Sequence, residues 1–405
     1  MNDIVTVIEI GTSAVKLVVG YKFEREVIVQ FAAAKKLSAN AVIDSTIHDE
    51  DEVSKSVREL LLEAQNTLKS DLKEATLVLP AIGLEVFGNV RMTPVLSTNN
   101  KISETDIRNV IATIFKDKYP TTNEVIDVLP IVYVLDNNRE YSNPPIGEES
   151  TMLNLRANVH TIPSDIVKSY RMAVERAGIR VKSLVAAPYG IAQMLTSYKE
   201  ITEEYFLVNI GAKTTTVTTI SNGEPFKSFH IYMGGDTITH TIEKRLGMSY
   251  EKAEELKKTY GLDPLKYDFV THIATSDNNP SIKFTVKDLN PIIEEALGHI
   301  SNDIVRALKI LSDDESFEKL PVVFVGGGSR LIGLKEYIQK VITTRDVIFP
   351  MIKSIGARNM TFIDVLGGIK VTSNVVVEDT SRDVPPVLTR DIPKKPKYSE
   401  TNDDL

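Results

Sequence analysis

The sequence predicts an α/β protein built from two related lobes, and an internal repeat is the strongest reason. The segments Val7–Gly11 and Leu207–Gly211 share one pattern: an apolar run, a polar side chain, an apolar residue and a glycine. Small hydroxylated residues follow each glycine, and then a second β-rich run, Val15–Val19 or Thr214–Ile220. Strand, glycine turn and strand are typical of a hairpin. Its recurrence, with strands alternating with helices elsewhere, favours two related α/β layers.

Composition narrows the class of protein. The chain has 405 residues, 42% of them hydrophobic and 25% charged, which suits two or more globular domains. The net charge of −8 and the absence of a basic block argue against nucleic acid as a partner. There are no cysteines, and the six histidines are scattered, so disulfides and a zinc site are not expected. Neither a signal peptide nor a membrane-spanning stretch is visible, so we expect a cytoplasmic protein.

Amphipathic helices follow the hairpins. One is predicted where Val53, Val57, Leu60, Leu61, Ala64 and Leu68 recur at helical spacing. A longer one is predicted over Asn290–Leu311, with Asn290 as N-cap and Pro291 at the first helical position. Its expected buried face consists of Ile292, Ile293, Ala296, Leu297, Ile300, Ile304, Ala307, Leu308 and Leu311.

The stretch from Leu84 to Ile162 has the pattern of a separate small α+β unit. Its candidate strands are Val86–Met92, Glu124–Leu129, Ile131–Leu135 and Leu153–His160. A helix is predicted to begin at Ser103, because Asp106 three residues later completes a capping-box pattern. From Asn374 the chain becomes polar and rich in proline, and we expect that tail to be disordered.

Three glycine-containing segments could hold a nucleotide. Backbone N–H groups in tight glycine turns can point at phosphate oxygens, and glycine lets a backbone approach a purine closely. Glu9, at the end of the first strand, could hold Mg²⁺ through water. A single glycine turn is usually only a turn, but three in this order favour a nucleotide-binding cleft. The segments are Gly11-Thr12-Ser13, Gly211-Ala212-Lys213-Thr214 and Gly326-Gly327-Gly328-Ser329.

These segments resemble the two phosphate motifs and the adenosine motif of the actin superfamily. Further segments are similar to the FtsA family of bacterial cell-division proteins: Val128–Asp136, Asn143–Gly147 and Leu155–His160 look like the small subdomain of that family, and Met233–Thr239 and Ala253–Gly261 look like its second-lobe helices. The resemblance covers roughly residues 4–371. It adds Lys16, Gly235, Glu254 and Lys257 to the expected nucleotide-binding residues.

The resemblance implies an actin-like (ribonuclease-H-like) two-lobed fold. Its divisions would be a first lobe at 1–83 and 163–200, an inserted subdomain at 84–162, a second lobe at 201–354, a return helix at 355–373 and the disordered tail at 374–405. It also implies binding of ATP and Mg²⁺, polymerisation, and linkage of FtsZ filaments to the division machinery at the cytoplasmic face of the plasma membrane. Other division proteins would be further partners. The C-terminal peptide of FtsZ would dock near the helix over Asn290–Leu311, where Arg306 and Lys309 are candidate contacts.

Several positions depart from the family pattern. Asn209, Lys213 and Thr216 stand where the second phosphate motif usually has an aspartate, a glycine and an aspartate, and Ala187 stands where a glutamate is common. Asn209 is therefore only a weak metal ligand, and we expect weak or absent ATP hydrolysis. No catalytic residue is assigned. The tail lacks the basic amphipathic helix with which FtsA usually ends, so no intrinsic membrane anchor is expected in this chain.

Two other interpretations share the actin-like fold. One is a small-molecule kinase, which needs a base near the γ-phosphate; Asn209 and Ala187 occupy the places where its carboxylate would be sought. The other is an adaptor of pilus assembly similar to PilM, which shares the small subdomain.

Overall fold

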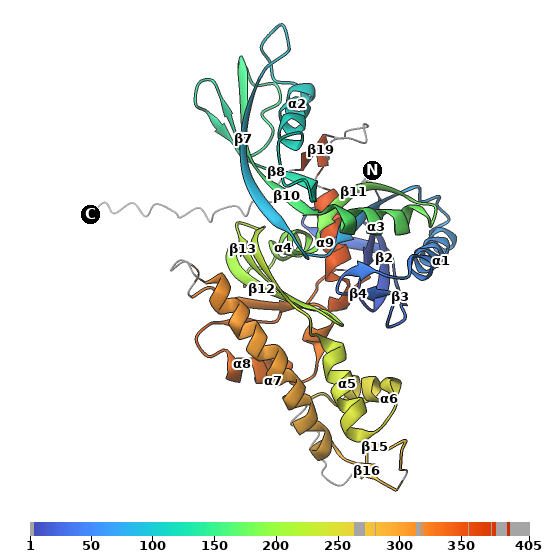
Figure 1. The fold of residues 1–405 in the computed structure, drawn as a ribbon. Coiled ribbons are helices and arrows are strands. Elements are labelled where there is room, and N and C mark those ends of the chain that lie inside the picture. The colour runs from blue at the N-terminus through green and yellow to red at the C-terminus, as the bar shows by residue number, and fades with distance from the viewer. Residues whose placement is uncertain are drawn as a thin grey trace, which may run out of the picture.

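Two five-stranded sheets with the same strand order form the two lobes of the computed structural model (Figure 1). The structure describes residues 4–262, 272–279, 281–312, 317, 319–354 and 356–373, together with the backbone of 375–377 and 387–388. The first sheet has the order β11-β6-β1-β2-β3, and the second has the order β14-β13-β12-β17-β18. In each sheet a central strand pairs antiparallel with the next strand in sequence and parallel with a later one. The repeat predicted from the sequence is therefore confirmed. The strands are β1 (Val5–Ile10), β2 (Ala14–Phe23), β3 (Glu26–Lys36), β6 (Glu74–Leu79), β11 (Arg180–Ala186), β12 (Glu204–Ile210), β13 (Thr215–Ser221), β14 (Glu224–Ile231), β17 (Val322–Val325) and β18 (Val347–Ile348).

Helices pack on the two sheets through their apolar faces. In the first lobe α1 (Glu50–Leu68) and α3 (Ser164–Glu175) share a hydrophobic core with the strands. The face predicted for α1 is confirmed, since Val53, Val57 and Leu60 are buried. In the second lobe α5 (Gly235–Leu246), α6 (Tyr250–Tyr260), α7 (Val286–Leu311) and α8 (Leu334–Val341) enclose a second core. Short elements complete the lobes: β4 (Val42–Ile43), β5 (Thr46–Ile47), β15 (Ala274–Thr275), β16 (Lys283–Phe284), η3 (Gly328–Arg330) and η4 (Met360–Phe362).

Two helices form the layer between the lobes. α4 (Ala187–Leu195) and α9 (Ile363–Thr372) belong to a core that also takes residues from both sheets. They cross closely because both have glycine at the crossing: a Cβ added at Gly367 would lie 2.9 Å from the Cα of Gly190. That approach needs two residues without side chains. α9, drawn in orange-red in Figure 1, thereby brings residues 363–372 back from the second lobe to the first.

The inserted unit is a four-stranded sheet of order β7-β10-β8-β9 with one helix, α2 (Glu104–Phe115), packed on it. Its strands are β7 (Glu85–Pro94), β8 (Asn123–Leu135), β9 (Glu140–Tyr141) and β10 (Met152–Pro163). The capping box predicted at Ser103 is confirmed: Asp106 accepts from the Ser103 backbone N–H at 2.8 Å and from its hydroxyl at 2.6 Å.

One sequence prediction in this unit is wrong: the strands expected on either side of Pro130 form the single strand β8. Proline cannot donate to a ladder, and within sheets it is confined to edges and bulges. Both conditions are met here, because the register with β10 shifts beside Pro130 and β9 pairs with β8 only at Tyr133 and Val134.

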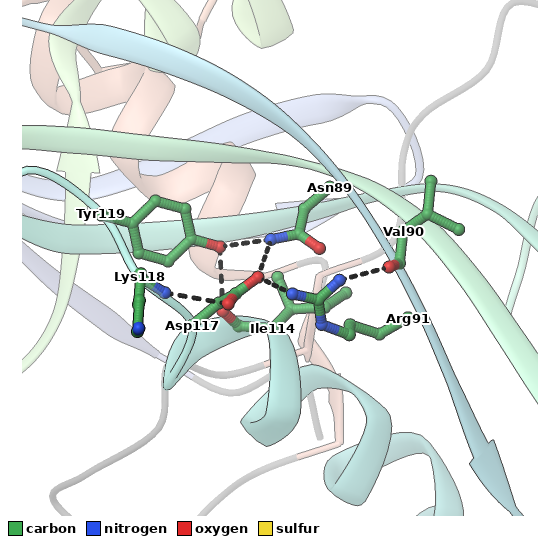
Figure 2. A network of polar contacts seen from close by, with 7 residues as sticks. All are labelled: Asn89, Val90, Arg91, Ile114, Asp117, Lys118 and Tyr119. Atoms are coloured by element: carbon green, nitrogen blue, oxygen red, sulfur yellow. Dashed lines mark hydrogen bonds and ion pairs between the residues drawn. The ribbon is translucent and has the colours of Figure 1, made fainter.

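A polar cluster fastens the edge strand β7 to the end of α2 (Figure 2). The Asn89 amide donates to Asp117 Oδ2 at 2.9 Å and to the Tyr119 hydroxyl oxygen at 2.8 Å, while Arg91 pairs with the same carboxylate. The Tyr119 hydroxyl donates to the Ile114 carbonyl at 2.8 Å. Hydrogen bonds from the Asn89 side chain, and to a smaller extent from the Lys118 backbone N–H, hold the pKa of Asp117 below its usual value.

The start of α7 also differs from the sequence prediction. The N-cap is Thr285, whose N–H and hydroxyl both donate to Asp288 Oδ2 at 2.8 Å, and Pro291 lies inside the helix. The capping box satisfies the free backbone donors one turn earlier, and the added turn buries Val286 and Leu289. These gains offset the single intrahelical bond that Pro291 lacks. The buried face predicted from Ile293 onward is confirmed.

Most of the predicted tail lies outside the described residues. Its described part differs from the expected disorder, because Val375–Val377 (β19) pairs antiparallel with Val387–Leu388 (β20), as β-branched residues favour. Across the described ranges, no helix has both the length and the apolar character that crossing a membrane requires.

Candidate functional site

The two predicted phosphate hairpins close in the same way. In each, the backbone N–H of the glycine that ends the strand donates to the carbonyl three residues later, from Gly11 to Ala14 and from Gly211 to Thr214, both at 2.9 Å. The two lobes therefore share this hydrogen bond in addition to their strand order. It leaves the turns Gly11–Ser13 and Gly211–Lys213 at equivalent corners of the two sheets.

Lys213 joins the two turns across the junction of the lobes. Its backbone N–H donates to the Thr12 hydroxyl oxygen at 3.3 Å. Its ammonium donates to the Val42 carbonyl at 2.9 Å and to the Ala39 carbonyl, both in the first lobe. The sequence predicts Lys213 as part of the second phosphate segment and as a departure from the family motif, and the bridge to the first lobe follows from its long side chain.

Behind the hairpins, four polar side chains from four elements meet. Lys16 Nζ of β2 lies 2.7 Å from Glu9 Oε2 of β1 and 3.7 Å from Asp364 Oδ2 of α9. The Asn209 amide of β12 donates to Asp364 Oδ1 at 3.2 Å. We call Glu9, Lys16, Asn209 and Asp364 the interlobe quartet. Asp364 is a further functional candidate that no sequence motif indicates. The signal available in the sequence is an acidic residue in the first turn of an otherwise buried, apolar helix.

Burial governs the electrostatics of the quartet. Burial raises the pKa of Glu9, the positive charge of Lys16 lowers it, and the negative charge of Asp364 raises it again; the net direction is upward. Burial alone would lower the pKa of Lys16, but the carboxylates of Glu9 and Asp364 outweigh it and raise that pKa. A lysine held charged between two carboxylates is suited to bind a phosphate oxygen.

The residues expected beside the adenosine lie around the start of α5. The Gly235 N–H donates to the Gly211 carbonyl at 3.0 Å, and the Asp236 N–H donates to the Ala212 carbonyl at 2.8 Å, so this helix start rests on the second hairpin. Lys257 Nζ donates to the Gly235 carbonyl at 2.9 Å and pairs with Glu254 at 2.5 Å. Bonds and charge from Lys257 outweigh the effect of burial and lower the pKa of Glu254.

The third predicted segment follows β17 and packs against the end of β12. Gly326 has a φ of +88°, and a Cβ there would lie 2.5 Å from the Ile210 carbonyl oxygen. Only glycine fits both conditions. The Ser329 hydroxyl donates to the Gly326 carbonyl at 2.8 Å, which closes the turn. Gly327 and Gly328 complete a glycine turn beside Asn209 and Ile210.

The structure therefore gathers the predicted residues at one junction, which we call the interlobe site: the two hairpins, the start of α5, the 326–329 turn and the interlobe quartet. Ala187, the first residue of α4, is buried in the core between the lobes. Among the described residues, no cluster of three or more His, Cys, Asp and Glu side chains could hold a metal ion. Two carboxylates and an amide oxygen suit a Mg²⁺ ion that keeps its waters and shares phosphate oxygens.

Two family models and the relatives similar in sequence agree on one family. The model described as "Cell division protein FtsA" matches residues 206–375, and that described as "SHS2 domain inserted in FTSA" matches residues 85–162. The cell division protein FtsA of Streptococcus pneumoniae (serotype 2, strain D39) is 28% identical over 365 residues, which are 89% of this chain and 78% of the relative. FtsA of Bacillus subtilis (strain 168) is 25% identical over 350 residues, 84% of this chain and 77% of the relative.

Solved structures with the same fold are actin-like. The PilM–PilN complex of type IV pilus biogenesis has a TM-score of 0.57 at 16% identity, covering 90% of this chain and 97% of that one. MreB5 of Spiroplasma citri bound to AMPPNP has a TM-score of 0.52 at 12% identity, covering 91% and 95%. At these identities the likeness concerns the fold, and the actin-like two-lobed fold with an inserted subdomain is confirmed.

Proposed function

The chain belongs to the FtsA family of actin-like cell-division proteins, and on that basis we propose that it binds Mg²⁺–ATP at the interlobe site and links FtsZ filaments to the division machinery. The observation that carries the proposal is the convergence of both glycine hairpins on one junction, joined by the contacts of Lys213 with Thr12, Ala39 and Val42. Backbone donors of both turns, the positive charges of Lys16 and Lys213, and the glycine turn at 326–329 offer what a nucleoside triphosphate needs.

Each group of residues has a distinct part in this proposal. Gly11, Thr12, Ser13 and Lys16 hold phosphate oxygens from the first lobe, and Gly211, Ala212, Lys213 and Thr214 hold them from the second. Gly326–Ser329, with Gly235, Glu254 and Lys257, surround the adenosine. The ion pair of Glu254 with Lys257 keeps both side chains ordered at the start of α5. Glu9 holds Mg²⁺ through water, and Asn209 contributes weakly because its amide carries no charge.

ATP hydrolysis is slow in this proposal. Asn209 provides no carboxylate that could act as a base toward water, and the buried methyl of Ala187 orients no attacking water. The same two residues argue against a small-molecule kinase, which needs a base near the γ-phosphate. ATP then serves as a structural ligand that favours assembly of the chain with further copies of itself.

The proposed partner site is the exposed face of α7. Arg306 and Lys309 are exposed there, one helical turn apart, while Ala307 and Leu308 between them are buried. Residues three positions apart share a helix face, so the two cations would meet an acidic peptide together. The FtsZ C-terminal peptide would dock on this face, and the chain would act at the cytoplasmic face of the plasma membrane at the division site.

The test is fluorescence anisotropy of a labelled FtsZ C-terminal peptide titrated with the full chain. We expect Arg306→Glu with Lys309→Glu to weaken binding, and the loss to shrink at high salt, because exposed charges are screened. The matched control is Lys55→Glu with Arg58→Glu on α1, two cations also three positions apart on a helix of the other lobe. Equal affinity of the parent and the α7 variant would move the site away from that face.

A further inference from the structure

The interlobe quartet contains a carboxylate in a place where the phosphate motifs do not supply one. The family motif has an aspartate where this chain has Asn209. The amide of Asn209 donates instead to Asp364 Oδ1 at 3.2 Å, and Asp364 lies in the first turn of α9. The two side chains are therefore hydrogen-bonded neighbours, one with the amide and one with the charge.

The charge of the junction is the same as if the aspartate were at position 209. Glu9 and Asp364 each carry one negative charge and Lys16 one positive charge, which leaves one negative charge in the quartet. A carboxylate on α9 lies one hydrogen bond away from the side chain at position 209 on β12, and the net charge of the quartet is the same in either arrangement. Asp364 is 6% exposed, and a buried carboxylate is costly unless it is paired.

From this exchange we propose that Asp364 is the second carboxylate of the Mg²⁺–nucleotide site, replacing the one absent at position 209. The inference rests on the proposed binding of nucleotide. Asp364 would accept hydrogen bonds from Mg²⁺-bound water and hold Lys16 toward the phosphates, with Asn209 fixing the orientation of its carboxylate. Outer partners of this kind set the orientation of metal ligands, and their loss typically lowers metal affinity by about 10- to 100-fold.

A simpler role for Asp364 must be separated from this one. An acidic residue in the first turn of a helix stabilises the helix through its dipole, with no ligand involved. Asp165 holds the equivalent place in α3 and is exposed. Asp165→Asn therefore removes a first-turn acid without touching the interlobe site, and it is the matched control.

The experiment is calorimetric titration of the full chain with AMPPNP, with Mg²⁺ and with EDTA in its place. The variants are Asp364→Asn, Asn209→Asp and the double variant that carries both. We expect Asp364→Asn to lower the Mg²⁺-dependent gain in affinity by about 10- to 100-fold. The double variant, in which the amide and the carboxylate have changed places, should recover the parent's gain. Asp165→Asn should equal the parent.

Thermal unfolding without nucleotide provides an independent readout. Asn209→Asp alone sets two carboxylates at hydrogen-bond distance, so it should lower the Tm, and the double variant should restore it because the hydrogen bond is re-formed in reverse. If Asp364→Asn does not fold, the parent and the double variant still give the decisive comparison.

Three results would overturn the inference, and the third would also overturn the proposed nucleotide function. An unchanged Mg²⁺ effect in Asp364→Asn means that its carboxylate does not serve the metal. A double variant that folds but lacks the Mg²⁺ effect means that the two positions are not interchangeable. A parent chain that binds no AMPPNP in either condition overturns the proposed nucleotide function and this inference together, whereas the first two results leave nucleotide binding intact.

Discussion

Replacing Lys213 by methionine should loosen the two lobes, because its ammonium extends from the second lobe to carbonyl oxygens of the first. The change removes the bonds to the Val42 and Ala39 carbonyls and keeps the backbone bond to Thr12. A hydrogen bond to a charged group contributes about 1.5–3 kcal/mol. Because Lys213 is half-buried, solvent screening reduces the sum of the two to about 1–3 kcal/mol. The ratio of closed to open chains should therefore fall about 5- to 150-fold.

Interlobe distances measured by paired spin labels test this prediction. The chain has no cysteine, so Glu63→Cys on α1 and Glu255→Cys on α6, both exposed, label one lobe each without further substitution. We expect Lys213→Met to broaden the distance distribution toward longer values when no nucleotide is present. Lys168→Met, at an exposed position on α3, is the control. A distribution identical to the parent's would refute the bridging role of Lys213.

Three further predictions concern stability and turnover. Gly367→Ala should lower stability by about 1–3 kcal/mol, because its Cβ would strike the backbone of Gly190, while Gly88→Ala, which has open space, should leave the Tm unchanged. Asp106→Asn should lower the free energy of unfolding by about 1 kcal/mol at neutral pH. Burial alone would raise the pKa of Asp106, but backbone hydrogen bonds from Leu96 and Ser103 outweigh it and lower that pKa. The stabilisation by Asp106 is therefore present above the unfolded pKa of about 3.9 and is lost as the pH falls through the lower folded value. Steady-state ATP turnover should stay below about 1 per second, and a faster rate would contradict the proposal of weak hydrolysis.

The sequence predicts correctly those features that depend on residues close together in the chain, and it misses those that depend on residues far apart. The hairpins, the α1 face and the capping box at Ser103 are local patterns, and all are confirmed. The start of α7 was missed because Asn290 and Pro291 give the stronger local signal, whereas the Thr285 capping box gains from burying Val286. The continuity of β8 through Pro130 depends on its neighbours in the sheet, which no local pattern reveals.

The same distinction between local patterns and long-range contacts applies to the interlobe site. Its glycine turns are visible in the sequence as motifs, and the structure brings all three together. Asp364 is 155 residues from Asn209 in sequence, and only the packing of α9 between the lobes makes the two neighbours. The bridge from Lys213 to the 39–42 segment is likewise a long-range contact. Motifs therefore predicted the glycine turns of the site, while the charged side chains around them depend on the fold.

Binding of ATP at the interlobe site is tested by calorimetric titration of the parent and of Gly327→Asp with Mg²⁺–ATP. Gly327 lies in the turn proposed to face the purine, where an added Cβ meets only the Thr361 methyl at 3.0 Å, so the variant should fold. Gly88→Asp, in the inserted subdomain, is the control for an added acidic side chain. We expect one site per chain in the parent and in the control, and loss of binding in folded Gly327→Asp. Undiminished binding by Gly327→Asp, or none by the parent, would contradict this expectation.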